Sequence, residues 1–181
     1  MLARTHLVFG ATCFASFAAL LHTTIHPVSL AIATGAALLP DLDHPQSLLG
    51  RRLWFISKPL SKLVGHRGVT HSLIAVMISM WALFNAGANT MLVGPLVIGY
   101  LSHILGDLLT KSGVPLFWPW KQKITVPLLW RTGSGAESVL RWLCYVIPLL
   151  LLRISLANIL MSMDKPWLRA LIEALGMVIL V

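Results

Sequence analysis

The stretch THLVFGATCFASFAALLHTTIHPVSLAIATGAALLP, residues 5–40, contains no Asp, Glu, Lys or Arg. It is about twice as long as the ~20 apolar residues that cross the ~30 Å hydrocarbon layer of a bilayer once. Its middle, residues 22–27, is polar and ends in a proline, which is typical of a turn. The stretch therefore predicts a membrane helical hairpin, with helices over 5–22 and 28–41.

A second stretch has the same organisation. Residues 69–106 are again free of Asp, Glu, Lys and Arg, and the segment 85–89, with Gly87 at its centre, predicts a turn. Helices are therefore expected over 72–86 and 90–109. Two further apolar segments follow: 139–161, in which Pro148 predicts a kink, and 167–181.

The composition agrees with a membrane protein. Of the 181 residues, 57% are hydrophobic and 11% are charged, and the mean hydropathy is +0.82, whereas a soluble domain has about 25% charged residues. These values exclude an ordinary soluble enzyme, a disordered chain and a coiled coil. The predicted fold class is all-α: a polytopic membrane helical bundle of two helical hairpins plus one or two C-terminal apolar helices. We expect a single domain over 1–181, with its motifs in 1–145 and the C-terminal helices in 138–181.

The basic residues predict the orientation of this bundle. They lie before the first helix, between the hairpins and after the second hairpin, and both hairpin tips lack Lys and Arg. The positive-inside rule therefore places the N-terminus and both linkers in the cytoplasm. The net charge of +8 then reflects membrane topology, because no nucleic-acid-binding motif accompanies it. A cleaved signal peptide over residues 1–25 is the competing interpretation of the N-terminus, but the apolar sequence continues beyond it without a soluble domain.

Most ionisable residues fall at one end of the predicted helices. His6 opens the first helix, His103 and Asp107 close the fourth, and the segments 40–45 and 65–72 adjoin the other two. Because each hairpin returns the chain to the side from which it started, these segments should meet at the cytoplasmic level. The candidate metal ligands are His6, Asp41, Asp43, His44, His66, His71, His103 and Asp107.

This convergence predicts a metal site. His103 and Asp107, at i and i+4, share one helix face and suit two ligands of one metal, or one ligand and a carboxylate that bridges two metals. Each motif alone also fits a solvated interfacial histidine, a helix stop or a basic loop. Ionisable residues at membrane depth are costly, however, and they are functional by default. Histidine and carboxylate ligands without cysteine fit Zn²⁺ best, with Mn²⁺ or Fe²⁺ as alternatives.

Two further residues are candidates for catalysis. Arg67 could bind an anionic substrate, because a guanidinium group binds phosphate bidentately, and the pair Arg51-Arg52 is the alternative. Glu137 has two interpretations. It is either an acidic residue in the first turn of a helix that Ser134 caps, or a carboxylate that serves the metal site as ligand or general base.

In this order, the motifs resemble the YdjM family: an early His, then Pro-Asp-x-Asp-His, His-Arg-Gly-x-Thr-His-Ser, Ser-His-x-x-x-Asp and Arg-Thr-Gly-Ser-Gly-x-Glu. Its members are bacterial inner-membrane proteins described as LexA-binding or LexA-regulated metal-dependent hydrolases. The family is distantly similar to zinc-dependent phospholipase C and the related zinc nucleases. The resemblance implies that a first metal is held by Asp41 or Asp43, His66 or His71, His103 and Asp107, with His6 and Asp107 reaching toward a second.

We therefore expect a membrane-bound, metal-dependent hydrolase at the cytoplasmic surface of the bacterial inner membrane. A phosphoester or phospholipid-like substrate fits a site at headgroup level, so membrane lipid is the expected partner. A regulator protein as partner is implied by the resemblance alone, and direct nucleic-acid binding is not expected. The alternatives are a metal-binding membrane transporter and a non-enzymatic scaffold or regulator-binding protein.

Overall fold

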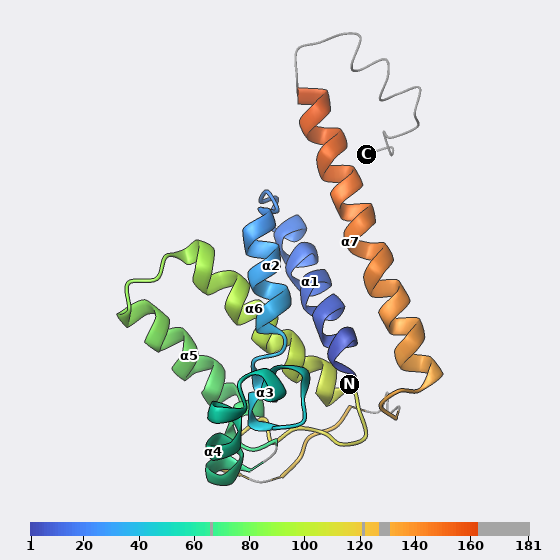
Figure 1. Ribbon diagram of the computed structural model, residues 1–181. Helices are drawn as coiled ribbons and strands as arrows, with labels where there is room; N and C mark the ends of the chain where they lie inside the picture. The colour runs from blue at the N-terminus through green and yellow to red at the C-terminus, as the bar shows by residue number, and fades with distance from the viewer. Residues whose placement is uncertain (66, 121, 127–130, 163–181) are drawn as a thin grey trace.

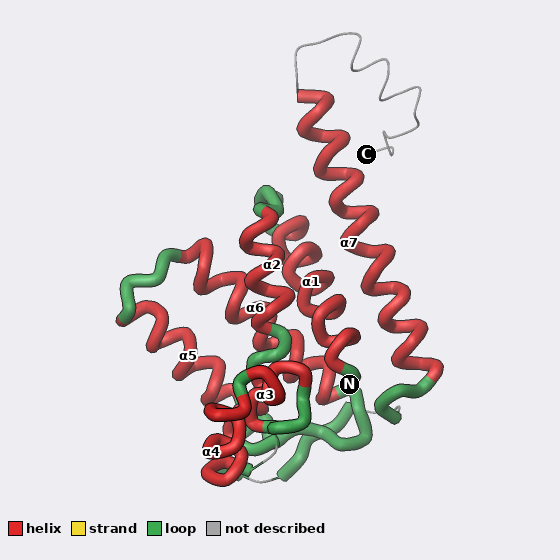
Figure 2. The backbone as a smooth tube through the Cα atoms, viewed as in Figure 1, coloured by secondary structure: helices red, strands yellow, loops and turns green. Residues whose placement is uncertain are grey.

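The computed structural model describes residues 1–65, 67–120, 122–126 and 131–162, with only the backbone path for 151–162 (Figure 1). In this part of the chain the regular structure is helical, as the predicted all-α class requires, apart from one antiparallel bridge between Val114 and Ile124 (Figure 2). The helices, with two 3-10 turns labelled η, are α1 Ala3–Leu20, α2 Pro27–Ala36, η1 Pro40–Asp43, α3 Leu48–Arg52, α4 Trp54–Val64, η2 Val69–His71, α5 Leu73–Asn85, α6 Thr90–Leu108 and α7 Gly135–Ser162.

The first hairpin consists of α1 and α2. His26 caps α2 through its Nδ1, which accepts the Val28 N–H at 3.3 Å, and Pro27 occupies the first turn, where its missing N–H costs nothing. The prediction extended the second helix to residue 41, but α2 ends at Ala36. Pro40 cannot donate the next helical hydrogen bond, and the chain tightens beforehand, with the Leu39 N–H donating to Ala36 at i−3.

The second hairpin consists of α5 and α6, close to the predicted bounds. Asn89 caps α6, its Oδ1 accepting the Leu92 N–H at 3.1 Å, and Gly87 supplies the positive φ of 74° in the turn. Of the described helices, α6 alone is long and apolar enough to cross a bilayer. The 10 residues of α2 and the 13 of α5 extend about 15 and 20 Å, against ~30 Å of hydrocarbon. The structure confirms the all-α class, and the number of crossings stays a prediction.

Small residues set the close packing of α1, α2 and α6, which contact one another. A Cβ on Gly10 of α1 would lie 2.7 Å from the Ala37 Cβ, and one on Gly99 of α6 would lie 2.1 Å from the Ala33 oxygen. Side chains larger than hydrogen would therefore force these helices apart. This packing brings the C-terminal part of α6 against the end of α2, where the candidate ligands lie.

The C-terminal helix α7 packs along α1 (Figure 1). The Thr12 hydroxyl donates to the Cys144 carbonyl at 2.7 Å, and the Arg141 guanidinium donates to the Thr5 hydroxyl at 3.3 Å. The helix is continuous through Pro148, at which the sequence predicts a kink. The second predicted C-terminal helix, 167–181, lies outside the described residues.

Candidate metal centre

Four short chain segments meet at one end of the bundle: the start of α1, the η1 turn after α2, the η2 turn before α5 and the end of α6. They bring together six of the eight predicted ligands, of which all but the partly exposed Asp41 are buried. These six are His6, Asp41, Asp43, His71, His103 and Asp107. His44 is half-buried beside η1 and belongs to neither of the two ligand groups that the described residues form. His66 lies outside the described residues.

Four donor atoms form a compact quartet: Asp41 Oδ1, Asp107 Oδ2 and the Nε2 atoms of His71 and His103. The two Nε2 atoms are 3.2 Å apart. Asp41 Oδ1 lies 3.9 Å from His71 Nε2 and 3.7 Å from His103 Nε2. Asp107 Oδ2 lies 3.8 and 3.9 Å from the same two nitrogens. Ligand atoms at ~2.0–2.2 Å from a tetrahedral Zn²⁺ are about 3.3–3.6 Å apart, so the five distances that involve the two Nε2 atoms are within a few tenths of an ångström of those in such a site.

Hydrogen bonds on the opposite side of each ring orient the two imidazoles. The Ala37 carbonyl lies 2.7 Å from His103 Nδ1 and can only accept, so Nδ1 carries the proton and Nε2 keeps its lone pair. At His71 the Thr70 hydroxyl oxygen is the hydrogen-bond partner of Nδ1, at 3.1 Å, and the Asp43 carboxylate makes an ion-pair contact with the same nitrogen at 3.3 Å. Carboxylate or carbonyl partners of this kind are usual behind metal-bound histidines. The geometry thus separates Asp41, which faces the Nε2 atoms, from Asp43, which supports a ring from behind.

Asp43 is itself held by several donors. The Arg67 backbone N–H donates to its Oδ2 at 3.0 Å, and the Thr70 hydroxyl donates to the same oxygen. The Tyr100 hydroxyl donates to the Thr70 carbonyl at 2.7 Å, which ties the η2 turn to α6. The sequence analysis missed Thr70 and Tyr100. The sequence indicates a role for these two residues only through their positions, since Thr70 precedes His71 and Tyr100 lies one helical turn before His103.

Asp107 connects the quartet to His6. Its Oδ1 lies 3.4 Å from His6 Nε2 and 2.5 Å from the Met1 nitrogen, while its Oδ2 faces the quartet. The His6 ring stacks on the His103 ring, with centroids 3.7 Å apart and an interplanar angle of 11°. His6, His103 and Asp107 form one group whose ligand atoms lie within 4.8 Å of one another, and Asp41, His71 and His103 form another. One carboxylate therefore faces two neighbouring candidate cation positions.

Arg67 lies beside the quartet, as its assignment to anion binding requires. Its Nη2 is 2.7 Å from Asp107 Oδ2, in an orientation that makes an ion pair but no hydrogen bond, and its Nη1 is buried without a hydrogen-bond partner among the described residues. Its backbone has a positive φ of 57°, and Gly68 follows it. A buried guanidinium nitrogen without a partner carries a desolvation cost that a ligand oxygen would relieve.

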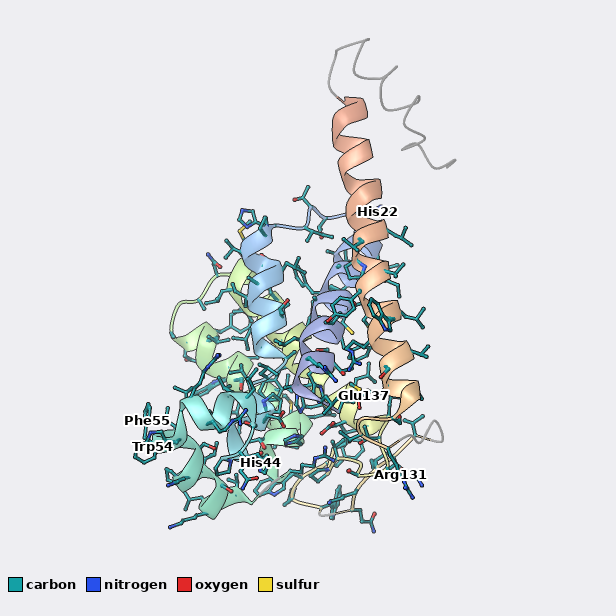
Figure 3. The ribbon with its side chains drawn as sticks, turned by 45° about the vertical axis from the view of Figure 1, so that its right-hand side comes forward. His22, His44, Trp54, Phe55, Arg131 and Glu137 are labelled. Atoms are coloured by element: carbon teal, nitrogen blue, oxygen red, sulfur yellow. The ribbon has the colours of Figure 1, made fainter. Side chains whose placement is uncertain are left out.

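The Glu137 side chain is fully buried away from the quartet, against the N-terminal segment. Its Oε1 accepts the Leu2 N–H at 2.7 Å, and its Oε2 accepts the Gly133 N–H at 2.6 Å. Burial alone would raise the pKa of this carboxyl group, but the N–H groups of Gly133 and Leu2 stabilise the anion and hold the pKa below its ordinary value. Ser134 caps α7 through a 3.4 Å contact with the Glu137 N–H, as the first interpretation of this segment expected. Glu137, which Figure 3 shows at the start of α7, thus anchors the segment that carries His6.

Comparison with known proteins identifies the family. The family model of the YdjM inner membrane proteins matches residues 1–179. Two proteins named inner membrane protein YdjM, from Escherichia coli K12 and Shigella flexneri, are 43% identical over 159 residues, which cover 81% of this chain and 79% of each relative. The uncharacterized protein YvsG of Bacillus subtilis 168 is 35% identical over 142 residues, covering 77% of this chain and 86% of that protein. No solved structure matches.

The names of the first two relatives support a location in the bacterial inner membrane. The matched segment includes the elements that carry the quartet. With a family match over nearly its whole length, this chain belongs to the YdjM family.

Proposed function

We propose that this protein is a metal-dependent hydrolase of the bacterial inner membrane that acts on a phosphoester of amphiphilic, phospholipid-like character. The observation that carries the proposal is the quartet of Asp41, His71, His103 and Asp107. The ligand atoms of Asp41, His71 and His103 lie within 4.8 Å of one another, and the buried Asp107 Oδ2, which has no hydrogen-bond partner among the described residues, lies 3.8 and 3.9 Å from the two Nε2 atoms. Mixed imidazole and carboxylate donors fit Zn²⁺, with Mn²⁺ and Fe²⁺ as alternatives.

The residues around the quartet have complementary tasks in such a reaction. Catalytic zinc sites have three protein ligands and water in the fourth position, so three of the four donors, such as Asp41, His71 and His103, would hold a Zn²⁺ that supplies a Lewis acid and lowers the pKa of that water. The Ala37 carbonyl and the Asp43 carboxylate hold the two imidazoles in the orientation that a metal needs. The Nη1 of Arg67 is available to bind an anionic oxygen of the substrate, and its Nη2 remains paired with Asp107.

An apolar groove supports a lipid-like substrate. It has a volume of about 460 Å³ and lies along α6 between α1 and the start of α5. Ser102 and Ile104, which flank His103, line it together with Leu108, which follows Asp107, and Leu73. At about 100° per residue, Leu101, Leu105 and Leu108 lie on the face of α6 roughly opposite His103 and Asp107, so the groove suits an acyl chain that lies beside the helix and does not itself lead to the quartet.

The orientation of the protein is part of the proposal. The quartet lies at the bundle end that carries the basic linkers, so the positive-inside rule favours a site at the cytoplasmic surface, with both hairpins crossing the membrane. The short helices α2 and α5 would then pair with longer neighbours in a locally thinned bilayer.

Metal analysis combined with a substrate screen tests this function. The full chain, purified in detergent and loaded with Zn²⁺, Mn²⁺ or Fe²⁺, should bind metal in fixed stoichiometry and hydrolyse at least one class among water-soluble phosphoesters and phospholipids. His103→Ala should abolish both properties, while His22→Ala, at the opposite end of α1, should leave both unchanged. Metal binding without hydrolysis of any of these substrates would favour the transporter or scaffold alternatives. Absence of metal binding would refute the site.

A further inference from the structure

The helix α4 presents a large apolar surface that no described residue covers. Trp54 and Phe55 in its first turn are 58% and 59% exposed, and Leu63 in its last turn is 83% exposed. Figure 3 shows Trp54 and Phe55 pointing away from the bundle. Only Ser57, near the middle of the helix, is fully buried. Exposed aromatic and aliphatic side chains of this density mark an interaction surface.

The order of side chains around α4 is amphipathic. At about 100° per residue, Phe55, Pro59, Leu63 and Ile56 form one continuous exposed stripe, and the buried Ser57 lies on the opposite side. Lys58 and Lys62 border this stripe, on the side where Trp54 lies. The Lys58 ammonium stands over the Trp54 ring, 5.1 Å from its centroid. Apolar side chains flanked by lysines and a tryptophan are typical of a helix that lies in the plane of a membrane interface.

The charge of this region indicates the kind of surface that it meets. Arg51 and Arg52 at the end of α3 are exposed, as are Lys58 and Lys62. No Asp or Glu occurs between residues 44 and 106, so no acidic neighbour in sequence offsets these four cations. A surface that is both apolar and strongly basic complements anionic headgroups above an acyl layer.

We propose that α3 and α4 form an interfacial anchor that binds the surface of a membrane containing anionic phospholipid. The apolar stripe lies in the headgroup–acyl boundary, and the four cations contact lipid phosphates. Figure 1 shows α3 and α4 together at one end of the bundle. Because α4 contacts η1, which carries Asp41, the anchor sets the quartet at the depth of the headgroups. The inference concerns membrane binding and holds whether or not the quartet is catalytic.

Site-directed spin labelling tests the depth of α4. A single cysteine replaces Phe55, Leu63 or Lys62 in the full chain from which Cys13 and Cys144 have been removed. A single cysteine at exposed Thr24, at the tip of the first hairpin, serves as the aqueous control. The labelled proteins are reconstituted in vesicles of phosphatidylcholine with phosphatidylglycerol. Labels at Phe55 and Leu63 should be accessible to oxygen and shielded from a water-soluble nickel chelate, at a depth of about 5–10 Å. The label at Lys62 should remain accessible to the chelate.

A charge variant tests the lipid preference. With Arg51, Arg52, Lys58 and Lys62 replaced by Gln, the label at Leu63 should move toward water and should no longer respond to the phosphatidylglycerol content. The parent protein should show a shallower label in pure phosphatidylcholine than in the mixture. Nickel accessibility at Phe55 and Leu63 equal to that at Thr24 would overturn the proposal and leave this face to a protein partner. An equal depth in both lipids would overturn the preference for anionic lipid.

Discussion

Arg67 and the quartet share one oxygen atom of Asp107. The Arg67 Nη2 lies 2.7 Å from Asp107 Oδ2, and the same oxygen lies 3.8 Å from His71 Nε2 and 3.9 Å from His103 Nε2. The Asp107 side chain is 1% exposed, so water cannot stabilise its charge. A buried carboxylate of this kind needs cations around it, and here a guanidinium group and a candidate metal position lie on the same side.

The first prediction concerns the charge of Asp107. Asp107→Asn keeps the shape of the side chain but removes the anion, so metal affinity should fall by at least about 100-fold. The measurement is metal content and competition titration of the purified protein, with insertion into the membrane checked beside it. His22→Ala is the matched control. Normal metal binding by Asp107→Asn would mean that the Asp107 carboxylate is no ligand and only pairs with Arg67. The metal would then have to be assigned to ligands around η1.

The second prediction separates Asp41 from Asp43. Asp41→Asn removes a donor atom of the quartet, whereas Asp43→Asn removes only the support behind His71. The metal affinity of Asp43→Asn should therefore fall by about 10–100-fold, and that of Asp41→Asn should fall by more. Competition titration with a chelator of known affinity measures both. A larger loss for Asp43→Asn than for Asp41→Asn would make Asp43 the ligand.

The third prediction concerns Arg67. Arg67→Gln removes a cation that competes for Asp107, so metal affinity should stay equal or rise. Binding of inorganic phosphate to the metal-loaded protein should weaken by about 10–100-fold, since hydrogen bonds to charged groups contribute ~1.5–3 kcal/mol. Calorimetric titration with phosphate measures this effect, and Arg131→Gln, at an exposed arginine that is given no role in anion binding, is the control. Unchanged phosphate affinity in Arg67→Gln would exclude Arg67 from anion binding.

The fourth prediction assigns Glu137 a positioning role. Glu137→Gln leaves one oxygen acceptor for the N–H groups of Leu2 and Gly133, so the protein should lose roughly 1–3 kcal/mol of stability and keep its metal. Thermal unfolding in detergent and metal analysis measure the two quantities. Loss of metal from a folded variant would make Glu137 a ligand, and loss of turnover with metal and stability intact would make it the base.

The same carboxylate predicts a dependence of stability on pH. Glu137 lies two residues before the apolar segment that begins at 139, and its folded pKa is below the ordinary value of 4.5. Its contribution to stability is therefore fully present above pH 4.5 and is lost as the pH falls through the lower, folded pKa. The stability of Glu137→Gln should not show this decrease at acid pH. Identical acid profiles of the parent and the variant would contradict the assignment.

The fifth prediction concerns orientation. Cysteines introduced at Thr24 and Ala86, near the two hairpin tips, should react with an impermeant maleimide added outside intact spheroplasts, and one at Lys58 should react only after the membrane is opened. Ala86 is preferred to its neighbour Gly87 because the positive φ of Gly87 would strain a cysteine. The opposite pattern would place the quartet on the periplasmic side.

The helical hairpins and the meeting of their polar ends could be predicted from the amino-acid sequence. Both depend on local properties, namely charge-free runs, turn residues at 22–27 and 85–89, and the return of each hairpin to its starting side. The i, i+4 relation of His103 and Asp107 follows from helix geometry alone. These features could be predicted because they require no knowledge of which helices touch.

Which atoms face one another depends on contacts between segments that are distant in sequence. Asp41 and Asp43 are two residues apart in one motif, and their different places depend on the tight η1 turn after Pro40 and on the position of His71 across from it. Likewise, the Ala37 carbonyl reaches His103 only because Gly10 and Gly99 let three helices approach closely. Glu137 contacts Leu2, 135 residues away in sequence. Contacts of this kind arise from packing between distant segments, which a local pattern does not encode.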